Sequence, residues 1–359
     1  MKQFFNQYRK EIEGELRTFF KDRKKSLSSI NPWGEDLLDR LQSFTVQGKM
    51  IRGGLNILSF LLFRTELARP VLQLAAAIEL IHSSLLIHDD IMDRDLMRRG
   101  GPSLFHQYSL LAEEQGIEEA GHFGESFGIC AGDIGFFLAF EILSKLDLDP
   151  GIRECIQVLW ARTFTAVGLA QMQDMFFSSV QSDVGESAII DLYRTKTARY
   201  TFSLPLATGA TAAGEDVATI DTLEQIGEHM GVAFQIKDDE LDLFGRETET
   251  GKPVGTDMEE GKKTLYYLHL VHLLTAGDDR LSGRESEVLR LLTQRRGIPS
   301  GTVEELRHIA EKHGIRDRVQ RKMEELSGRA EELINGMSAR EEYRKVLLDV
   351  LLYNIERKR

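Results

Sequence analysis

The chain is organised around residues 79–102, which read ELIHSSLLIHDDIMDRDLMRRGGP. This stretch and the residues just before it predict an α-helix with one buried face, because large apolar side chains recur at spacings of four and three. These side chains are Leu74, Ile78, Ile81 and Leu85. At the end of the predicted helix, Asp89 and Asp93 are four residues apart, so their carboxylates leave the same side about 6 Å from each other.

The carboxylate pair is followed at once by Arg98, Arg99 and Gly100. Two like charges one helical turn apart repel each other, and no structural need explains them. We therefore interpret Asp89 and Asp93 as ligands of a divalent metal ion, with the guanidinium groups beside them for a polyphosphate.

A second copy of the pattern is found in residues 234–242, which read FQIKDDELD. Asp238 and Asp242 are again four residues apart and again follow an apolar helical run. Either copy alone could be the solvated end of a helix. Two copies, each after an apolar helix, favour two clusters that face each other across a helical bundle.

The 359 residues are 42% hydrophobic and 28% charged, which indicates a globular chain with a sizeable core. The longest apolar run, 57–63, is far shorter than a membrane span, and the charged N-terminus does not resemble a signal peptide. Cys130 and Cys155 lie in apolar helical patterns and are interpreted as buried free thiols. We therefore predict a cytoplasmic protein without a membrane segment.

The net charge of −12 argues against a nucleic-acid partner. Basic residues nevertheless gather near the two aspartate motifs, which favours small anionic ligands over a polymer of phosphates. These residues are Lys49, Arg52, Arg98, Arg99, Lys196, Lys252 and Lys262.

Nearly every segment predicts a helix, and no run alternates with the two-residue period of a strand. Residues 110–125 are predicted to form a solvated loop or a short surface helix, and Pro205 is predicted to interrupt a helix. We predict one all-α domain over residues 1–359, a helical bundle around a central apolar cavity. The catalytic core is expected at 45–275, and charged C-terminal helices at 283–359.

Paired aspartate motifs beside cations suit one kind of chemistry. Hard carboxylate oxygens select Mg²⁺ or Mn²⁺ over zinc, and Mg²⁺ commonly bridges carboxylates and substrate phosphates. A diphosphate held in this way is a good leaving group, because the charge that develops on it is already stabilised. Apolar helices below it would hold a hydrocarbon tail and shelter a carbocation from water.

The ordered set of short motifs resembles that of the trans-type isoprenyl diphosphate synthases, the polyprenyl synthetase family. The resemblance is close from Lys49 to Lys263, and it implies the isoprenoid synthase type of helical bundle. Each motif is weakly specific alone, whereas the set is highly specific. In chain order the motifs are GKMIR at 48–52, His82, DDIMD at 89–93, RRG at 98–100, Gln171 with Asp174, Lys196 with Thr197, FQ at 234–235, DDELD at 238–242, GKP at 251–253, Asp257, Gly261 and Lys262.

The resemblance implies a metal site of three Mg²⁺ ions, for which Mn²⁺ can substitute. In that site Asp89, Asp93 and Asp238 coordinate the ions on an allylic diphosphate. The other aspartates act mostly through water molecules, and they are Asp90, Asp174, Asp239 and Asp242.

The resemblance also implies two substrates and a homodimer formed through the central helices. The allylic diphosphate is held by Arg98, Lys196 and Lys252. Lys262, in the same loop as Lys252, is also a substrate-binding residue. Isopentenyl diphosphate is held by Gly48, Lys49, Arg52, His82 and Arg99. The catalytic set comprises Lys196, Thr197, Gln235 and Phe234, of which Thr197 and Gln235 line the path of the carbocation.

Product length is predicted from the helix that precedes Asp89. Ser84 and Leu85 are small and medium-sized, so the floor of the hydrocarbon pocket is predicted to be open there. Ile81 and Ile78 lie about 4–5 Å and 9 Å deeper. One or two isoprene units beyond fifteen carbons fit above them, which predicts geranylgeranyl diphosphate, with farnesyl or longer products as the alternatives.

Three other protein classes compete with this interpretation. A ferritin-like di-metal bundle needs two E-x-x-H motifs on apolar helices, and among the candidates only residues 79–82 qualify. A terpene cyclase commonly carries different ligands in its second motif, which residues 238–242 argue against. A non-catalytic subunit of a heteromeric synthase should have lost aspartates, and all six are present.

Overall fold

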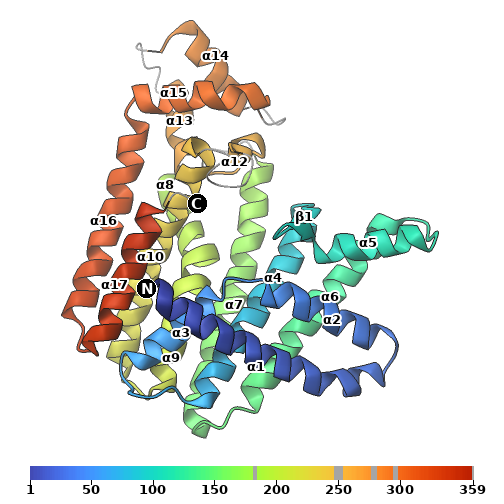
Figure 1. Cartoon of the computed structure of the whole chain (residues 1–359). Coiled ribbons are helices and arrows are strands. Elements are labelled where there is room, and N and C mark those ends of the chain that lie inside the picture. Colours follow the sequence, from blue (N-terminus) through green and yellow to red (C-terminus); the bar gives the residue numbers. More distant parts are fainter. Residues whose placement is uncertain (181–183, 246–253, 276–280, 294–297, 358–359) are drawn as a thin grey trace. The chain divides into compact units, whose positions relative to one another are not determined.

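The computed structural model describes residues 1–180, 184–245, 254–275, 281–293 and 298–357. Over these ranges nearly all regular structure is helical (Figure 1), which confirms the all-α prediction. The strands found there are β1 (Met97–Arg98) and β2 (Gly101–Pro102), a short antiparallel pair directly after the first aspartate motif.

The contacts of the chain divide it into two compact units. The first contains Met1–Gln157 and Thr208–Glu215, and the second contains Val158–Ala207 and Asp216–Arg359. The first aspartate motif belongs to the first unit and the second motif to the other. The single domain expected over the whole chain, and its central cavity, remain predictions.

The first unit is built from six whole helices and parts of two others. The whole helices are α1 (Lys2–Ser28), α2 (Trp33–Val46), α3 (Ile51–Leu61), α4 (Arg69–Met92), α5 (Leu104–Glu114) and α6 (Ala120–Ser144). It also takes the start of α7 (Pro150–Ser179) and the end of α9 (Leu204–Ala212).

The second unit holds the rest of α7 and α9 together with the C-terminal helices. Its central pair is α10 (Val217–Phe244) and the π-helix η1 (Tyr193–Ser203), which continues α8 (Glu186–Leu192). The other elements are α12 (Thr256–Glu259), α13 (Leu265–Thr275), α14 (Gly283–Leu292), η2 (Ser300–Thr302), α15 (Val303–Lys312), α16 (Ile315–Gly336) and α17 (Glu341–Glu356).

Three glycines of α6 let this helix approach α4 closely, because a Cβ on any of them would collide with a side chain of α4 or its neighbours. The pairs are Gly128 with Ile91, Gly132 with His88, and Gly135 with Ser84. The C-terminal part of the helix that carries the first aspartate motif, from Ser84 to Ile91, is therefore held by one glycine-lined face.

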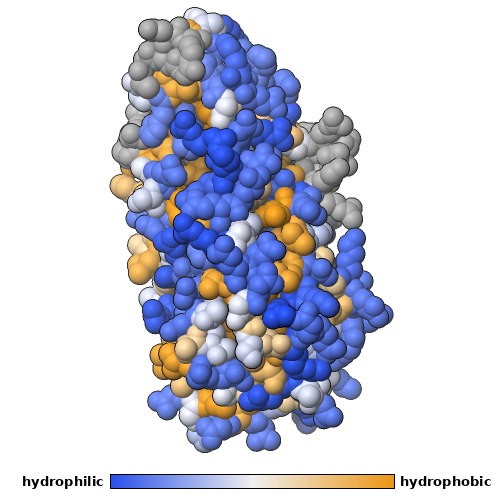
Figure 2. Space-filling view, turned by 90° about the vertical axis from the view of Figure 1, so that its left-hand side faces the viewer, coloured by the Kyte–Doolittle hydropathy of each residue, from blue (hydrophilic) through white to orange (hydrophobic). Residues whose placement is uncertain are grey.

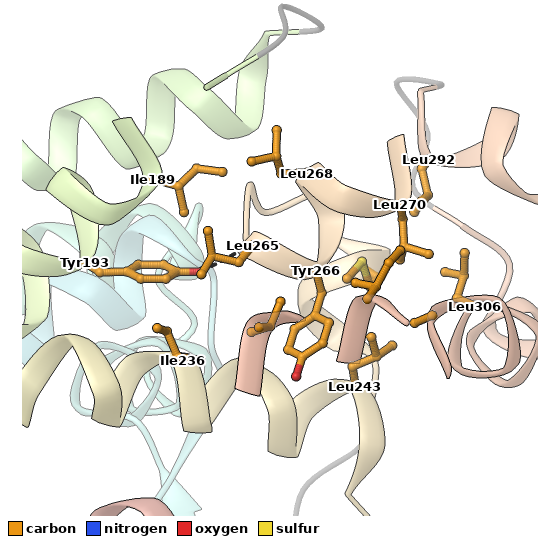
Figure 3. Close-up of a cluster of buried hydrophobic side chains, with 14 of the residues drawn as sticks. Ile189, Tyr193, Ile236, Leu243, Leu265, Tyr266, Leu268, Leu270, Leu292 and Leu306 are labelled. Carbon is orange, nitrogen blue, oxygen red and sulfur yellow. Dashed lines mark hydrogen bonds between the residues drawn. The ribbon is translucent and has the colours of Figure 1, made fainter. Parts of the chain in front are cut away.

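A stripe of four residues on α10 faces η1 in the second unit. Gly227 and Gly231 lack side chains where the backbone of η1 comes close, and Gln235 and Asp239 continue the stripe at the same four-residue spacing with hydrogen bonds to η1. Around this pair lies a buried cluster of apolar side chains from α10, α13, α15 and neighbouring elements (Figure 3).

Three expectations about local structure were wrong or incomplete. Residues 110–125 are mostly helical, because α5 extends to Glu114 and α6 begins at Ala120. Pro205 does not end the helix, because η1 (Tyr193–Ser203) runs directly into α9 at Leu204; it lies where the π-helix changes to an α-helix. Cys130 and Cys155 are free but exposed, since they lie on faces of α6 and α7 that no described part of the chain covers.

Among the described residues, two helices, α4 and α6, are long and apolar enough to cross a membrane. Within the structure, 67% of the most apolar window of α4 and 44% of that of α6 are buried, as in core helices of similar length and apolar character. On the face drawn in Figure 2, hydrophilic side chains predominate and hydrophobic ones form separate groups.

The close packing of α10 on η1 predicts a large effect of adding one methyl group. We expect Gly231→Ala to lower the free energy of unfolding by about 1–3 kcal/mol, because its Cβ would overlap the Cα of Ala198. The matched control is Gly328→Ala on α16, where the added Cβ meets open space. This substitution should raise the free energy of unfolding by about 0.5–1 kcal/mol. Urea unfolding followed by circular dichroism measures both, and equal effects of the two variants would contradict this account.

Candidate active site

The end of α4 presents the outer aspartates of the first motif. Asp89 is half-buried, and Asp93 is exposed at the position that caps the helix. Asp93 donates its backbone N–H to the carbonyl of Asp89 at 2.8 Å, and the positive φ of 58° at Arg94 then ends the helix. Two carboxylates therefore reach solvent from the last turn of one helix.

Asp90, the middle aspartate, has a different environment because it is fully buried. Its Oδ1 accepts a hydrogen bond of 2.6 Å from Nε of Arg98, whose Nη2 also donates to Asp95 at 2.9 Å. Burial raises the pKa of Asp90 to about 6, and the guanidinium of Arg98 opposes that rise. Asp90 thus holds Arg98 in place, a contact that the spacing of the motif did not predict.

Arg99 points back toward the loop after α2. Its Nη1 donates to the carbonyl of Phe44 at 2.5 Å, and its guanidinium lies 5.0 Å from the centre of the Phe44 ring. A Cβ at Gly48 would be only 3.3 Å from Nη2 of Arg99. The structure therefore brings together Gly48 and Arg99, which the motifs place 51 residues apart (99 − 48).

Glu79 is a residue of this region that sequence reasoning missed. It is buried, and its Oε1 accepts a 2.8 Å hydrogen bond from the N–H of Gly53 in the first turn of α3. Burial raises the pKa of Glu79, while the charges of Arg52 and Arg99 lower it. The sequence feature that could have revealed Glu79 is that it is the one charged residue within the apolar helical run 74–85.

His82 lies among the same cations. Burial lowers the pKa of His82 well below its usual range, and the nearby charges of Arg52, Arg99 and Arg98 lower it further. The imidazole is therefore neutral near pH 7. Lys49, by contrast, is an exposed residue just before α3.

In the second unit, η1 carries the lysine and threonine of the K-T motif. Lys196 forms an ion pair with Asp174 of α7, a contact that the sequence did not predict. Thr197 donates its hydroxyl to Oε1 of Gln235 at 2.8 Å. A π-helix is rare and is often found at functional sites, which agrees with these two residues sharing one.

Asp239, the middle aspartate of the second motif, is buried like Asp90. One oxygen accepts from the hydroxyl of Tyr193, and the other accepts from Nε2 of Gln235 at 2.9 Å. Burial raises the pKa of Asp239 well above its usual range, and the charge of Asp257 raises it further. Tyr193 was not singled out in the sequence.

Asp242 organises the loop that follows α10. Its carboxylate accepts from the hydroxyl of Thr256 at 2.8 Å and from the N–H of Asp257 at 3.2 Å. Asp257 is in turn 3.2 Å from Nζ of Lys262, which also pairs with Glu260. Burial raises the pKa of Asp257 to about 6, and Lys262 opposes the shift. Lys252 lies outside the described residues.

Asp238 is the most open aspartate of the second motif, with 55% of its side chain exposed. Arg357, just beyond α17, donates to its Oδ1 at 2.8 Å and to the carbonyl of Phe234 at 3.3 Å. The guanidinium also stacks over the Phe234 ring at 3.9 Å. The guanidinium of Arg357 thus pairs with Asp238, a predicted metal ligand, which shows that this carboxylate is accessible to a cation.

The residues expected to set product length lie along α4. Ile78, Ile81 and Ser84 are buried, and Leu85 is half-buried. Ser84 donates its hydroxyl to the carbonyl of Leu80 at 3.0 Å and faces Gly135 of α6. A ring at position 84 would therefore have to displace α6, whereas position 85 has more room.

The outer aspartates of both motifs suit a hard divalent cation, because their side chains are partly open to solvent and supply only oxygen atoms as ligands. Within the described ranges, no three or more His, Cys, Asp or Glu side chains converge on one point. Each motif therefore offers an incomplete shell, of the kind that a phosphate group and water would fill.

Comparison with known proteins agrees with this geometry. The family model described as polyprenyl synthetase matches residues 35–287. A short chain isoprenyl diphosphate synthase from Methanocaldococcus jannaschii is 34% identical over 227 residues, 63% of each chain, and a geranylgeranyl diphosphate synthase from Methanosarcina mazei is 35% identical over 223 residues, 62% of this chain and 63% of that one. The match spans slightly less than two thirds of the length of these two relatives.

A solved structure extends the similarity to nearly the whole chain. The geranylgeranyl pyrophosphate synthase from Corynebacterium glutamicum, complexed with isoprenyl diphosphate and magnesium, has a TM-score of 0.87 at 27% identity and covers 98% of both chains. With its two aspartate motifs, its R-R-G and K-T elements and this fold, the chain belongs to the polyprenyl synthetase family.

Proposed function

We propose that the protein is a trans-prenyltransferase that condenses isopentenyl diphosphate with an allylic diphosphate to give an all-trans prenyl diphosphate. The observation that carries the proposal is the end of α4, where Asp89 and Asp93 reach solvent beside Arg98, which is held by the buried Asp90. This arrangement combines oxygen ligands for a metal with a fixed cation for phosphate.

In this proposal Mg²⁺, held by Asp89, Asp93 and Asp238, neutralises the charge that develops on the departing diphosphate. Mn²⁺ is expected to substitute, since it accepts the same oxygen ligands. Arg98 and Lys196 contribute fixed positive charge from the protein, because each is tied to a carboxylate that limits its movement.

The second diphosphate binds to the cationic group of the first unit. Arg52 and Arg99 supply the charge, and the buried Glu79 stabilises them where water is scarce. The neutral His82 can donate one hydrogen bond without adding a further cation. Gly48 keeps the space beside Arg99 clear, since a side chain there would press on the guanidinium.

The carbocation path is assigned to Thr197, Gln235 and Phe234 in the second unit. Their hydroxyl, amide oxygen and aromatic face are groups that stabilise positive charge without attacking it. The departing diphosphate takes the final proton, so no further base is required of the protein.

Geranylgeranyl diphosphate is the proposed product, and farnesyl or longer prenyl diphosphates are the alternatives. Support comes from the name of one relative and from Leu85, which leaves the wall of α4 only moderately filled. We also propose a cytoplasmic location, which the two free cysteines favour.

A second copy of the chain is the proposed partner. On α6, Ile129, Phe137 and Phe140 are 48%, 73% and 37% exposed and lie on one side of the helix. Apolar side chains grouped in this way are typical of protein interfaces.

Removing single carboxylates tests the proposed metal site. We expect Asp89→Asn, Asp93→Asn and Asp238→Asn each to lower kcat by about 100-fold or more while the protein stays folded, because these side chains are partly exposed. The control is Asp221→Asn on the exposed side of α10, which should keep full activity. Diphosphate release measures turnover, and full activity in EDTA would refute metal dependence.

The contact of Arg357 with Asp238 predicts competition with the metal. We expect Arg357→Ala to tighten Mg²⁺ binding by up to about five-fold, because a partly exposed ion pair contributes up to about 1 kcal/mol. Arg344→Ala, which breaks another arginine ion pair of α17, is the control and should leave binding unchanged. Calorimetric titration without substrate gives the affinities, and unchanged binding by the Arg357 variant would exclude competition.

Product length is tested at position 85, because Leu85 is only half-buried whereas Ser84 is buried against Gly135 of α6. We expect Leu85→Phe to shorten the main product by one isoprene unit, because the larger side chain fills space beside α4. Leu86→Phe, turned by about 100° around the helix, should leave the product unchanged. Chromatography of the dephosphorylated prenols identifies the products, and an unaltered product from Leu85→Phe would remove this residue from the pocket wall.

The homodimer is tested by charging the exposed face of α6. We expect Phe137→Glu to shift the protein from dimer to monomer, because a carboxylate buried in an interface without a partner is strongly unfavourable. Ile30→Glu is the control, since Ile30 is equally exposed, at 72%, but lies outside α6. Light scattering measures the mass, and a monomeric wild-type protein at assay concentration would contradict the proposed partner.

A further inference from the structure

Tyr193 occupies a position that the proposed reaction has not yet explained. It begins η1, four residues before Thr197, and is buried in the cluster drawn in Figure 3. We propose that Tyr193, acting through Asp239, is a positioning residue that orients Gln235 and Thr197. This inference rests on the proposed prenyltransferase function.

A continuous chain of hydrogen bonds connects these residues. The backbone N–H of Leu265 donates to the Tyr193 hydroxyl at 3.1 Å, and that hydroxyl donates to Oδ2 of Asp239. Oδ1 of Asp239 accepts from Nε2 of Gln235, and Oε1 of Gln235 accepts from the Thr197 hydroxyl. The amide NH₂ of Gln235 can only donate and its oxygen can only accept. The bond from Nε2 to Asp239 therefore leaves Oε1 to accept from Thr197.

The spacing of the two helices makes this chain possible. Tyr193 and Thr197 are four residues apart on η1, and Gln235 and Asp239 are four apart on α10. Tyr193 meets Asp239 and Thr197 meets Gln235, so the two pairs run in opposite directions along the sequence and form two rungs between antiparallel helices. The close approach at Gly231 brings η1 near enough for both rungs to form.

The consequence for Gln235 is a fixed amide orientation. With Nε2 on a carboxylate, its oxygen must point to Thr197, and the Thr197 hydrogen must point to Gln235. The lone pairs of the threonine oxygen are then the part of the hydroxyl left for a positively charged carbon. If the tyrosine hydroxyl is removed, one oxygen of the buried carboxylate loses its donor. The carboxylate can then turn and draw the amide of Gln235 away from Thr197.

Asp239 acquires a different role from the one that the motif suggests. It is 4% exposed, and both of its oxygens accept hydrogen bonds from the protein, whereas Asp238 is open to solvent. The structure therefore assigns Asp238 to the metal site and Asp239 to the alignment of Gln235. The two neighbouring aspartates should respond differently when each is changed.

The test compares Tyr193→Phe with Tyr266→Phe. Tyr266 is a second buried tyrosine of the same apolar cluster, and its hydroxyl forms no hydrogen bond with the described residues. We expect Tyr193→Phe to lower kcat about ten-fold, with less than about two-fold change in KM for either diphosphate and in the Mg²⁺ requirement. Tyr266→Phe should alter none of these, and an unchanged kcat in Tyr193→Phe would overturn the inference.

A double-mutant cycle separates positioning from a general loss of stability. Tyr193→Phe and Thr197→Val should be non-additive in kcat, because both disrupt one chain, although the two side chains are not hydrogen-bonded to each other. Additive effects would overturn the proposal. If Tyr193→Phe does not fold, Asp239→Asn replaces it, and it should lower kcat without the change in Mg²⁺ requirement expected of Asp238→Asn.

A structural readout keeps the inference testable if the wild-type protein shows no prenyl transfer, an outcome that would refute the proposed function alone. In protein labelled with ¹⁵N at glutamine side chains, the NH₂ resonance of Gln235 should shift in Tyr193→Phe and stay in place in Tyr266→Phe. An unmoved resonance in Tyr193→Phe would show that Tyr193 does not orient Gln235.

Discussion

The burial of one carboxylate in each aspartate motif is the constraint on which the surroundings of both motifs depend. A carboxylate removed from water is unfavourable unless hydrogen-bond donors replace the lost hydration. Asp90 meets this requirement with Arg98, and Asp239 meets it with Tyr193 and Gln235. The middle aspartate of each motif therefore fixes neighbouring side chains, whereas Asp89, Asp93 and Asp238 keep part of their surface open to solvent.

This division explains why two motifs with one pattern build different surroundings. In the first unit, the partner of the buried carboxylate is a cation from a short hairpin, so the motif extends into the group of cations proposed to bind phosphate. In the second unit, the partners are neutral donors from η1 and α10, so the motif extends toward residues assigned to the carbocation path. The buried carboxylate thus holds a cation in one unit and an amide in the other.

Close helix approach is the second requirement, and glycine supplies it in both units. The glycines of α6 hold α4, and those of α10 hold η1, at distances that no side chain would permit. The hydrogen bonds that join η1 to α10, from Thr197 to Gln235 at 2.8 Å and from Tyr193 to Asp239, depend on that distance. Positioning of the site and packing of the core are therefore consequences of the same contacts.

Much of the fold and site could be predicted from the sequence. Helical periodicity revealed the helices, and the spacing of Asp89 with Asp93 and of Asp238 with Asp242 revealed two carboxylate pairs, because i,i+4 geometry is a property of one helix. Motif order identified the family. These features are local, or follow a fixed order along the chain, whereas the ion pair of Lys196 with Asp174 was found only in the folded chain.

Other features were decided by the tertiary structure alone. The partners of Glu79, Asp239 and Asp238 come from elements 26, 46 and 119 residues away, and no local pattern reports such distances. The burial of an aspartate, which distinguishes Asp90 from Asp89, depends on the helices that surround it rather than on its neighbours in sequence. The sequence by itself determined which residues carry charge and on which helices, whereas packing determined which charges are buried, paired and held still, because desolvation and hydrogen bonding act between segments that meet only in the folded chain.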